Sequence, residues 1–291
     1  MYYVVYGFLY ALSLFPLRAL FLLSDLAYFL IYHVFGYRKK VVMQNLSIAF
    51  PNKTEEERKK IASKFYRNLT DTFVETIKLI SASPAFVNRH MTGDYSIFQR
   101  IYEQGRKCQI HTGHNFNWEL SNAGLALNMP QKLLVVYMPL ESKIFDRIFM
   151  KLRTRFGSVM LSAKDMRNSI LPHRGDIYTL GLVADQSPAN PRAGYWVNFF
   201  GRPTIFVKAP ENGARIANIP VVFMQITRRK RGYYQIHFEM GEEHPAQLER
   251  GVLTKRYVQY LERVIGEHPE MWLWSHRRWK LDWKEEYGEV L

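Results

Sequence analysis

The sequence predicts an α/β domain preceded by a hydrophobic helical segment at the N-terminus. From residue 105 onward, short apolar runs typical of strands alternate with longer runs typical of helices. Residues 1–36 are almost wholly apolar, and hydrophobic residues make up 47% of the 291-residue chain, enough to build a core. We therefore expect a membrane-associating segment over residues 1–40 and one globular α/β domain over residues 41–291.

The composition limits the classes of function. The chain carries 40 Lys and Arg against 26 Asp and Glu, and its net charge of +14 favours anionic partners such as a membrane, nucleic acid or an acidic protein. The one cysteine, Cys108, makes no intrachain disulfide and no cysteine-rich zinc site, which suits a reducing compartment. The chain has no G-x-S-x-G, P-loop or G-x-G-x-x-G motif, which argues against a serine hydrolase, a P-loop NTPase and a dinucleotide enzyme.

The apolar N-terminus contains two blocks, residues 1–17 and residues 19–37, and Pro16 lies near their junction. Neither block is a clean span of about 20 residues, so a tilted membrane span and a helical hairpin lying in the interface both fit. A hairpin buried in a soluble domain is the alternative. A signal peptide is not expected, because no Lys or Arg precedes the apolar run and no small-residue cleavage site follows it. The basic residues 38–40 place the following domain on the cytoplasmic side by the positive-inside rule.

Thr54 and Glu57 have the spacing of a capping box, which predicts that a helix begins there. Apolar residues then recur at steps of three and four up to about residue 81, and Pro84 ends the pattern. Basic residues on the other faces of this helix are expected to be solvated, and contact with lipid head groups is the alternative. Glu75 lies late in the helix, where a carboxylate opposes the helix dipole, so we expect a specific partner to hold it.

Further elements are predicted from hydrophobic periodicity and from the Gly and Pro residues between them. The expected strands are residues 108–110, 133–137, 158–161, 177–184, 221–227 and 233–240. The expected helices are residues 95–103, 118–128, 143–153, 164–171, 207–218 and 253–266.

The stretch from His111 to Glu119 joins the first expected strand to a helix through a sharp turn. An open α/β sheet usually places its chemistry at such a turn. In one continuous helix the side chains of His114 and Glu119 would point about 140° apart. If the helix begins after His114, with Asn115 or Asn117 as its cap, the two side chains can converge. Glu119 would then orient the imidazole and stabilise its charged form, and a bystander pair is the alternative.

Two other kinds of chemistry are less favoured at this turn. Cys108 lies near two histidines and is a candidate nucleophile, but a buried, inert thiol in a strand is the commoner case. His111, His114 and Glu119 lack the H-E-x-x-H geometry of a zinc site, so no metal is expected.

Four later stretches carry residues suited to a site. Arg153 and Arg155 close a helix, where they either stabilise its C-terminus or bind an anion. Asp185 follows a strand, which suits either a site or an ordinary turn. Residues 199–204 form a loop that either cradles an acyl chain and a phosphate or simply turns. Residues 272–280 are aromatic and basic, which suits a membrane interface or stacking on RNA bases.

In this order behind a hydrophobic N-terminus, the motifs resemble those of the bacterial lipid A biosynthesis acyltransferases, the late lauroyl/myristoyl acyltransferases. The resemblance covers nearly the whole chain. It rests on Asn45-Leu46 through Phe50-Pro51, Gly113-His114-x-x-Asn117-Trp118-Glu119, Asp185-Gln186, Phe199-Phe200-Gly201-Arg202 and residues 272–279. It implies a glycerolphosphate-acyltransferase-like mixed sheet flanked by helices. It also implies an enzyme on the cytoplasmic face of the cell inner membrane, which transfers an acyl chain from acyl carrier protein to a hydroxyl of a lipid A precursor.

The resemblance also implies roles for individual residues. His114 would be the general base, Glu119 its orienting partner, and Arg155 and Asp185 the remaining catalytic residues. The implied substrate-binding residues are Asn117, Arg153, Gln186 and Arg202. Neither a metal nor another cofactor is implied.

Two alternatives remain open at this point. The chain reads Asp185-Gln186-Ser187-Pro188 where enterobacterial members read Asp-His-Asp-Tyr-Gly. The acceptor is therefore either a lipid A precursor or another lipid, such as a lysophospholipid, glycerol phosphate, a glycolipid or an amino-acid lipid. A membrane-tethered RNA-binding protein is the rival from another class, but no RRM, KH or helix-turn-helix pattern is found, so no nucleic acid partner is expected.

Overall fold

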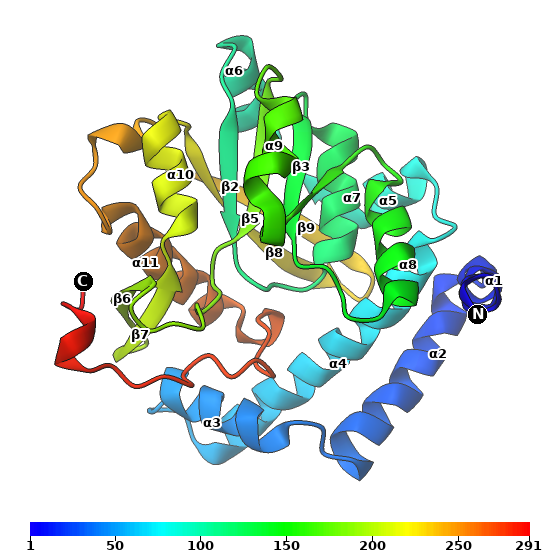
Figure 1. Ribbon diagram of the computed structural model, residues 1–291. Helices are drawn as coiled ribbons and strands as arrows, with labels where there is room; N and C mark the ends of the chain where they lie inside the picture. Colours follow the sequence, from blue (N-terminus) through cyan, green and yellow to red (C-terminus); the bar gives the residue numbers. More distant parts are fainter.

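A computed structural model describes residues 1–291 as helices packed around a mixed sheet (Figure 1). The helices are α1 (Tyr2–Leu14), α2 (Leu17–Tyr28), α3 (Lys39–Ala49), α4 (Glu55–Leu79), α5 (Pro84–His90), α6 (Ser96–Glu103), α7 (Trp118–Asn128), α8 (Lys143–Thr154), α9 (Met166–Ile170), α10 (Ala209–Ala217) and α11 (Val252–Glu267). The strands are β1 (Met91–Gly93), β2 (Cys108–Thr112), β3 (Lys132–Tyr137), β4 (Val159–Ser162), β5 (Tyr178–Val183), β6 (Gly194–Phe199), β7 (Arg202–Val207), β8 (Val221–Lys230) and β9 (Tyr233–Glu242). A π-helical turn, η1 (Phe29–Val34), continues α2, and a 3-10 turn, η5 (Pro269–Met271), follows α11.

Seven strands form one sheet in the order β1-β9-β8-β2-β5-β3-β4, and only the β8–β9 pair is antiparallel. The α/β class with a mixed, largely parallel sheet is therefore confirmed. Thr112 at the end of β2 pairs with Val183 of β5 and Met224 of β8, so the chain leaves β2 and β5 at the same edge. Figure 1 shows α10 and α11 on one side of this sheet and α5, α7 and α8 on the other.

The local predictions agree with most of these elements. All six predicted strands form, and the helix after β2 has the predicted bounds, Trp118–Asn128. The capping box of α4 is also confirmed, because the Thr54 amide donates to Glu57 at 2.7 Å and the Glu57 amide donates to Thr54 Oγ1 at 3.2 Å.

Other elements differ from the prediction. Helices α3 and α5 and strand β1 were not predicted, and residues 164–171 form short turns around α9 instead of one helix. Residues 199–204 end one strand and begin the next in the separate β6–β7 hairpin, so the alternative of a simple turn is confirmed. Phe200 and Gly201 form its tight turn with φ of +52° and +71°, a left-handed conformation that suits glycine at the second position.

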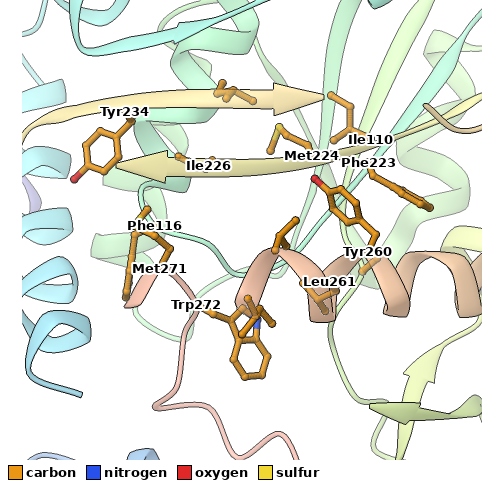
Figure 2. Close-up of a cluster of buried hydrophobic side chains, with 14 of the residues drawn as sticks. Ile110, Phe116, Phe223, Met224, Ile226, Tyr234, Tyr260, Leu261, Met271 and Trp272 are labelled. Carbon is orange, nitrogen blue, oxygen red and sulfur yellow. The ribbon is translucent and has the colours of Figure 1, made fainter. Parts of the chain in front are cut away.

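The main hydrophobic core extends from the sheet to the segment after α11. Figure 2 shows part of it, where Phe223 and Met224 of β8 lie near Leu261 of α11, and Trp272 lies close by. Trp272 is 2% exposed. The C-terminal segment is therefore part of the core and lies against the edge of the sheet where β2 ends.

Helix α2 runs beside α4 (Figure 1), and its two faces differ in chemistry. On the inner face, Ser24 donates to Asp71 at 2.6 Å and the Tyr28 hydroxyl lies 2.8 Å from Ser63 Oγ. The outer face of α1, α2 and η1 exposes large apolar side chains: Tyr3, Val4, Phe8, Leu14, Phe15, Leu22, Leu23, Leu26, Phe29, Leu30 and Val34. The outer face of this hairpin is therefore not buried within the chain. By length and composition, the continuous helix Leu17–Val34 suffices to cross a membrane.

Candidate active site

The turn after β2 carries the candidate general base. The strand ends at Thr112, Gly113 and His114 follow, and α7 begins at Trp118. Asn117 caps this helix, because its Oδ1 accepts the Leu120 amide at 3.2 Å. The predicted strand, sharp turn and helix are therefore confirmed, with Asn117 as the cap.

His114 is held by Asp185, which follows the neighbouring strand β5. Its Nδ1 lies 2.6 Å from Asp185 Oδ1, and its backbone amide donates to Asp185 Oδ2 at 2.9 Å. Residue 113 must be small for this contact, since a Cβ there would lie 3.2 Å from Asp185 Oδ2 and 2.9 Å from Leu261. The His114 side chain remains 27% exposed, and its Nε2 makes no hydrogen bond within the chain. The free Nε2 can therefore accept a proton from a bound molecule.

The burial of Asp185 does not neutralise it. Burial alone would raise the pKa of its carboxyl group, but the charge of His114 and hydrogen bonds from His114 and Trp272 lower that pKa to about 2. The Trp272 indole donates to Oδ2 at 2.8 Å. In turn, burial favours neutral His114, while the Asp185 carboxylate more than offsets this and raises the pKa of His114 above its usual value. The result is an imidazole–carboxylate pair with one ring nitrogen fixed and the other free.

The prediction that Glu119 orients His114 is wrong. Arg153 of α8 binds Glu119 through two nitrogens, with Nη2 at 2.6 Å from Oε1 and Nε at 3.0 Å from Oε2. The Trp118 indole donates to Glu119 Oε1 at 3.2 Å. Glu119 therefore ties the first turn of α7 to α8 and makes no hydrogen bond to His114. The carboxylate that reaches His114 comes from the adjacent strand.

The other predicted site residues are divided between structural contacts and the surface. Arg155 donates to the Leu79 carbonyl at 2.5 Å, where it caps the C-terminal end of α4. Arg202 pairs with Asp282 at 3.2 Å on the surface. Neither arginine hydrogen-bonds to His114 or Asp185. The Asn117 amide donates to Glu75 at 2.6 Å, and Gln186 is exposed directly after Asp185.

Glu75 has the specific partners that its position predicts. The Tyr234 hydroxyl donates to Glu75 Oε2 at 2.7 Å, beside the Asn117 amide. Burial raises the pKa of Glu75 to about 8 although both hydrogen bonds act against it. This neutral network attaches the start of α7 to α4 and β9.

Residues 269–279, which we name the C-terminal strap, cover the catalytic turn. The Leu273 amide donates to the His114 carbonyl at 3.1 Å, and the Phe116 amide donates to the Met271 carbonyl at 3.0 Å. Asn45 of α3 holds the strap from outside, because its side-chain amide donates to the carbonyls of residues 274 and 276, both at 2.7 Å. Trp272 and Trp274 are at most 2% exposed, so the predictions of a membrane interface and of RNA stacking for these tryptophans are wrong.

Arg278 in the strap is a buried cation near the pair. It donates to Ser187 Oγ and, at 2.9 Å, to the Ile205 carbonyl, and its guanidinium lies 4.1 Å from the centre of the Phe206 ring. Burial lowers the pKa of Arg278 to about 10, and the Asp185 carboxylate opposes that shift. His276 stacks beside His114 with ring centres 6.3 Å apart. The motif at residues 272–280 was visible in the sequence, but nothing local in it indicated that it returns to His114.

Two remaining candidates are structural. Cys108 is fully buried, lies 3.1 Å from Thr179 Oγ1, and has its pKa raised to about 12 by burial, so it is an inert thiol. His111 points to the opposite side of β2 from Cys108, bonds to Gln109 at 2.9 Å, and has its pKa lowered to about 3 by burial. No three His, Cys, Asp or Glu side chains converge in a way that could hold a metal ion.

Comparison with known proteins gives matches of one kind. A family model described as bacterial lipid A biosynthesis acyltransferase matches residues 1–281. The chain is similar to lipid A biosynthesis palmitoleoyltransferase of Escherichia coli (strain K12), with 21% identity over 251 residues, which are 84% of this chain and 79% of that protein. It is similar to the same extent to lipid A biosynthesis acyltransferase of Shigella flexneri.

Proposed function

The chain belongs to the bacterial lipid A biosynthesis acyltransferase family, and on that premise we propose that it moves a fatty acyl chain from acyl carrier protein to a hydroxyl of a lipid A precursor. The observation that carries the proposal is the His114–Asp185 pair at the edge of the sheet where β2 and β5 end. Such a pair suits the removal of a proton from an alcohol, which is the step that acyl transfer to a hydroxyl requires.

In the proposed mechanism, His114 Nε2 takes the proton of the acceptor hydroxyl. The hydroxyl oxygen forms a bond to the thioester carbonyl carbon, and the bond from that carbon to sulfur then breaks. The imidazolium returns its proton to the departing thiolate, so the enzyme is unchanged at the end. Asp185 bonds Nδ1 throughout and stabilises the charged imidazolium, while the strap holds the His114 backbone.

Arg278 has a positioning role in this proposal. Its bonds to Ser187 and Ile205 connect the loop that follows Asp185 to β7. Its buried positive charge also acts against protonation of His114, which favours the neutral form that a general base needs.

We place α1, α2 and η1 in the membrane interface instead of across the bilayer. Lys78 of α4 contacts the Ser13 carbonyl of α1, and Ser63 of α4 contacts Tyr28 of α2, so α4 lies at the same depth as α1 and α2. Helix α4 exposes Lys64 and Arg67 on this stretch, and such charges are costly in hydrocarbon. A monotopic arrangement exposes the apolar outer face to lipid and keeps α4 in water.

The proposed location is the cytoplasmic face of the cell inner membrane. The basic residues 38–40 support this side, and acyl carrier protein is a cytoplasmic donor. The net charge of +14 suits both an acidic carrier protein and an anionic lipid acceptor.

Lipid analysis of a strain that lacks the protein tests the proposal. Loss of one acyl chain from lipid A, restored by the wild-type gene and not by His114→Ala, is the expected result. Accumulation of a lysophospholipid with unchanged lipid A would instead identify the alternative acceptor class. Complete restoration by His114→Ala would overturn the assignment of the base.

A further inference from the structure

A basic cavity lies at the tip of the β8–β9 hairpin, separate from the catalytic turn. It has a volume of about 310 Å³, and three cationic side chains and no acidic one line it. The lining residues are Arg89, Thr92, Arg229, Lys230, Tyr233 and Tyr234. Positive charge gathered in a hollow without a carboxylate raises the local concentration of anions.

The charges of this hairpin fall into two kinds. Arg228 and Arg231 form ion pairs with the buried Asp71 carboxylate at 2.8 and 2.7 Å, so their charges have a structural role. Arg229 and Lys230, between them in the sequence, are exposed and form no ion pair. Arg89 is likewise exposed and unpaired on the facing helix α5. Three cations around one cavity therefore lack a counter-ion within the chain, and Lys230 lies over the Tyr233 ring at 4.3 Å.

The walls of the cavity are held in place. His90 Nδ1 bonds the Gly232 carbonyl at 2.6 Å, and the His90 ring stacks between Phe86 and Tyr233 with ring centres 4.0 and 4.4 Å apart. On the other side, Tyr234 is fixed by its bond to Glu75. The cationic side chains thus extend from a rigid frame, which lowers the entropic cost of binding.

The cavity borders the apolar N-terminal helices. Leu17 and Phe21 of α2 pack on Gly232 at the hairpin turn, where a Cβ would meet them at 3.1 and 3.2 Å. Figure 1 shows α1 next to the first turn of α2 at this end of α4. If the outer face of these helices lies in the interface, as proposed above, the cavity lies at the depth of the lipid head groups.

The cavity also lies beyond the same end of the parallel strands as His114. Strand β8 is parallel to β2, and Met224 pairs with Thr112 at the end of β2. From Met224 the strand continues to Lys230, which is about 20 Å at about 3.3 Å per residue. The cavity therefore lies beyond the end of the sheet that carries His114.

We propose that this cavity binds a phosphate group carried by a membrane lipid. The cations Arg89, Arg229 and Lys230 contact the phosphate oxygens. The proposal rests on the interfacial placement of α1 and α2, but it does not depend on the acyl-transfer reaction. The phosphate belongs either to bulk phospholipid or to the acceptor, and two measurements separate these sources.

The first measurement is binding of the purified full-length protein to vesicles. The probes are phosphatidylcholine alone, phosphatidylcholine with phosphatidic acid, and phosphatidylcholine with oleate at matched surface charge. The test variant is Arg89→Gln/Arg229→Gln/Lys230→Gln, and the control variant, Arg174→Gln/Arg250→Gln/Lys255→Gln, removes three exposed, unpaired cations elsewhere. We expect the test variant to bind phosphatidic acid vesicles about tenfold or more weakly than the control variant, and oleate vesicles equally well.

The second measurement is the KM for the acceptor lipid in the same two variants. An increase in KM with unchanged vesicle binding assigns the phosphate to the acceptor, and reduced vesicle binding assigns it to bulk phospholipid. Equal behaviour of the test and control variants in both measurements overturns the proposal. An equal loss on oleate vesicles also overturns it, because the cavity would then respond to charge and not to phosphate. A wild-type protein that binds vesicles but transfers no acyl chain would contradict the proposed function and leave the cavity supported.

Discussion

Asp185 and Glu119 are both buried carboxylates near the turn after β2, and they differ in the group that faces them. Asp185 accepts bonds from His114 and Trp272, and the imidazole it holds keeps one free nitrogen. Glu119 faces the guanidinium of Arg153, which is permanently charged and occupies both carboxylate oxygens. The first carboxylate therefore prepares a base, and the second joins two helices. Asp185 bonds His114 because the strands that precede them, β5 and β2, are neighbours in the sheet. Glu119 is closer to His114 in the sequence but does not bond it.

The largest expected effect comes from removing the base. His114→Ala should reduce the acyl-transfer rate by about 10²–10⁴-fold, because it removes the imidazole that Asp185 orients. The measurement is acyl transfer by purified membranes, with the amount of protein in the membrane as the control for folding. His276→Gln is the matched control, since it changes the neighbouring ring and leaves the pair with Asp185 intact. A rate near that of wild type for His114→Ala would remove the pair from the mechanism.

Removal of the carboxylate that orients the base should have a smaller effect than removal of the base. Asp185→Asn should reduce the rate by about 10²-fold, the lower end of the range for general-base help, because an amide cannot accept all the bonds from His114 and Trp272. The base works only when it is neutral, so activity rises with pH through the pKa of His114. Because Asp185 raises that pKa, its loss should move the acid limb of the kcat/KM profile to lower pH. An acid limb that does not move would show that Asp185 has no charge effect on the ring.

The same chemical change at the other carboxylate should alter stability and not the pH profile. Glu119→Gln leaves Arg153 partly buried without its counter-ion, which should cost about 2–3 kcal/mol of unfolding free energy, less than a fully buried pair because Arg153 is 20% exposed. Denaturant unfolding measures this loss. Replacing both partners by Glu119→Leu/Arg153→Met should recover part of it, since no unpaired charge remains. If Glu119→Gln moved the acid limb as Asp185→Asn does, the two carboxylates would not have separate roles.

A third buried carboxylate, Glu75, gives the smallest and most pH-dependent effect. Its hydrogen bonds come only from the neutral donors Asn117 and Tyr234, the nearby charges of Asp71 and Arg228 act in opposite directions, and burial raises its pKa from 4.5 to about 8. The stability that this raised pKa contributes is complete below the ordinary pKa and is lost as the pH rises through about 8. Glu75→Gln mimics the protonated acid, so its Tm should equal that of wild type below about pH 4.5 and exceed it by several degrees above about pH 9. Equal Tm values across the whole range would mean that Glu75 is not neutral in the folded protein.

Local patterns were sufficient to predict much of the fold. The bounds of α7, the capping box of α4 and the six predicted strands depend on neighbours within a few residues, where periodicity and capping act directly. Strands β6 and β7 were missed because they carry Gly194 and Pro203 and face a local hairpin partner instead of the main sheet. Helix α3 was missed because basic residues open it and only one face of it is buried.

The sequence identified the main residues of the candidate site but not which carboxylate bonds His114. His114 and Asp185 were both identified, but the sheet order that places β5 beside β2 cannot be derived from spacing along the chain. Glu119 was assigned to His114 because only five residues separate them, whereas its real partner, Arg153, lies on another helix. The C-terminal strap was interpreted as an interface motif because its burial depends on contacts with α3 and β2 that are far away in the sequence.

Titration of His114 by NMR tests the central claim most directly. The protein labelled at histidine Cε1 would be compared in detergent micelles as wild type, Asp185→Asn and Glu119→Gln, and the His114→Ala spectrum assigns the resonance. The structure predicts that the pKa of His114 falls in Asp185→Asn and is unchanged in Glu119→Gln. A fall in Glu119→Gln with no change in Asp185→Asn would contradict the pairing.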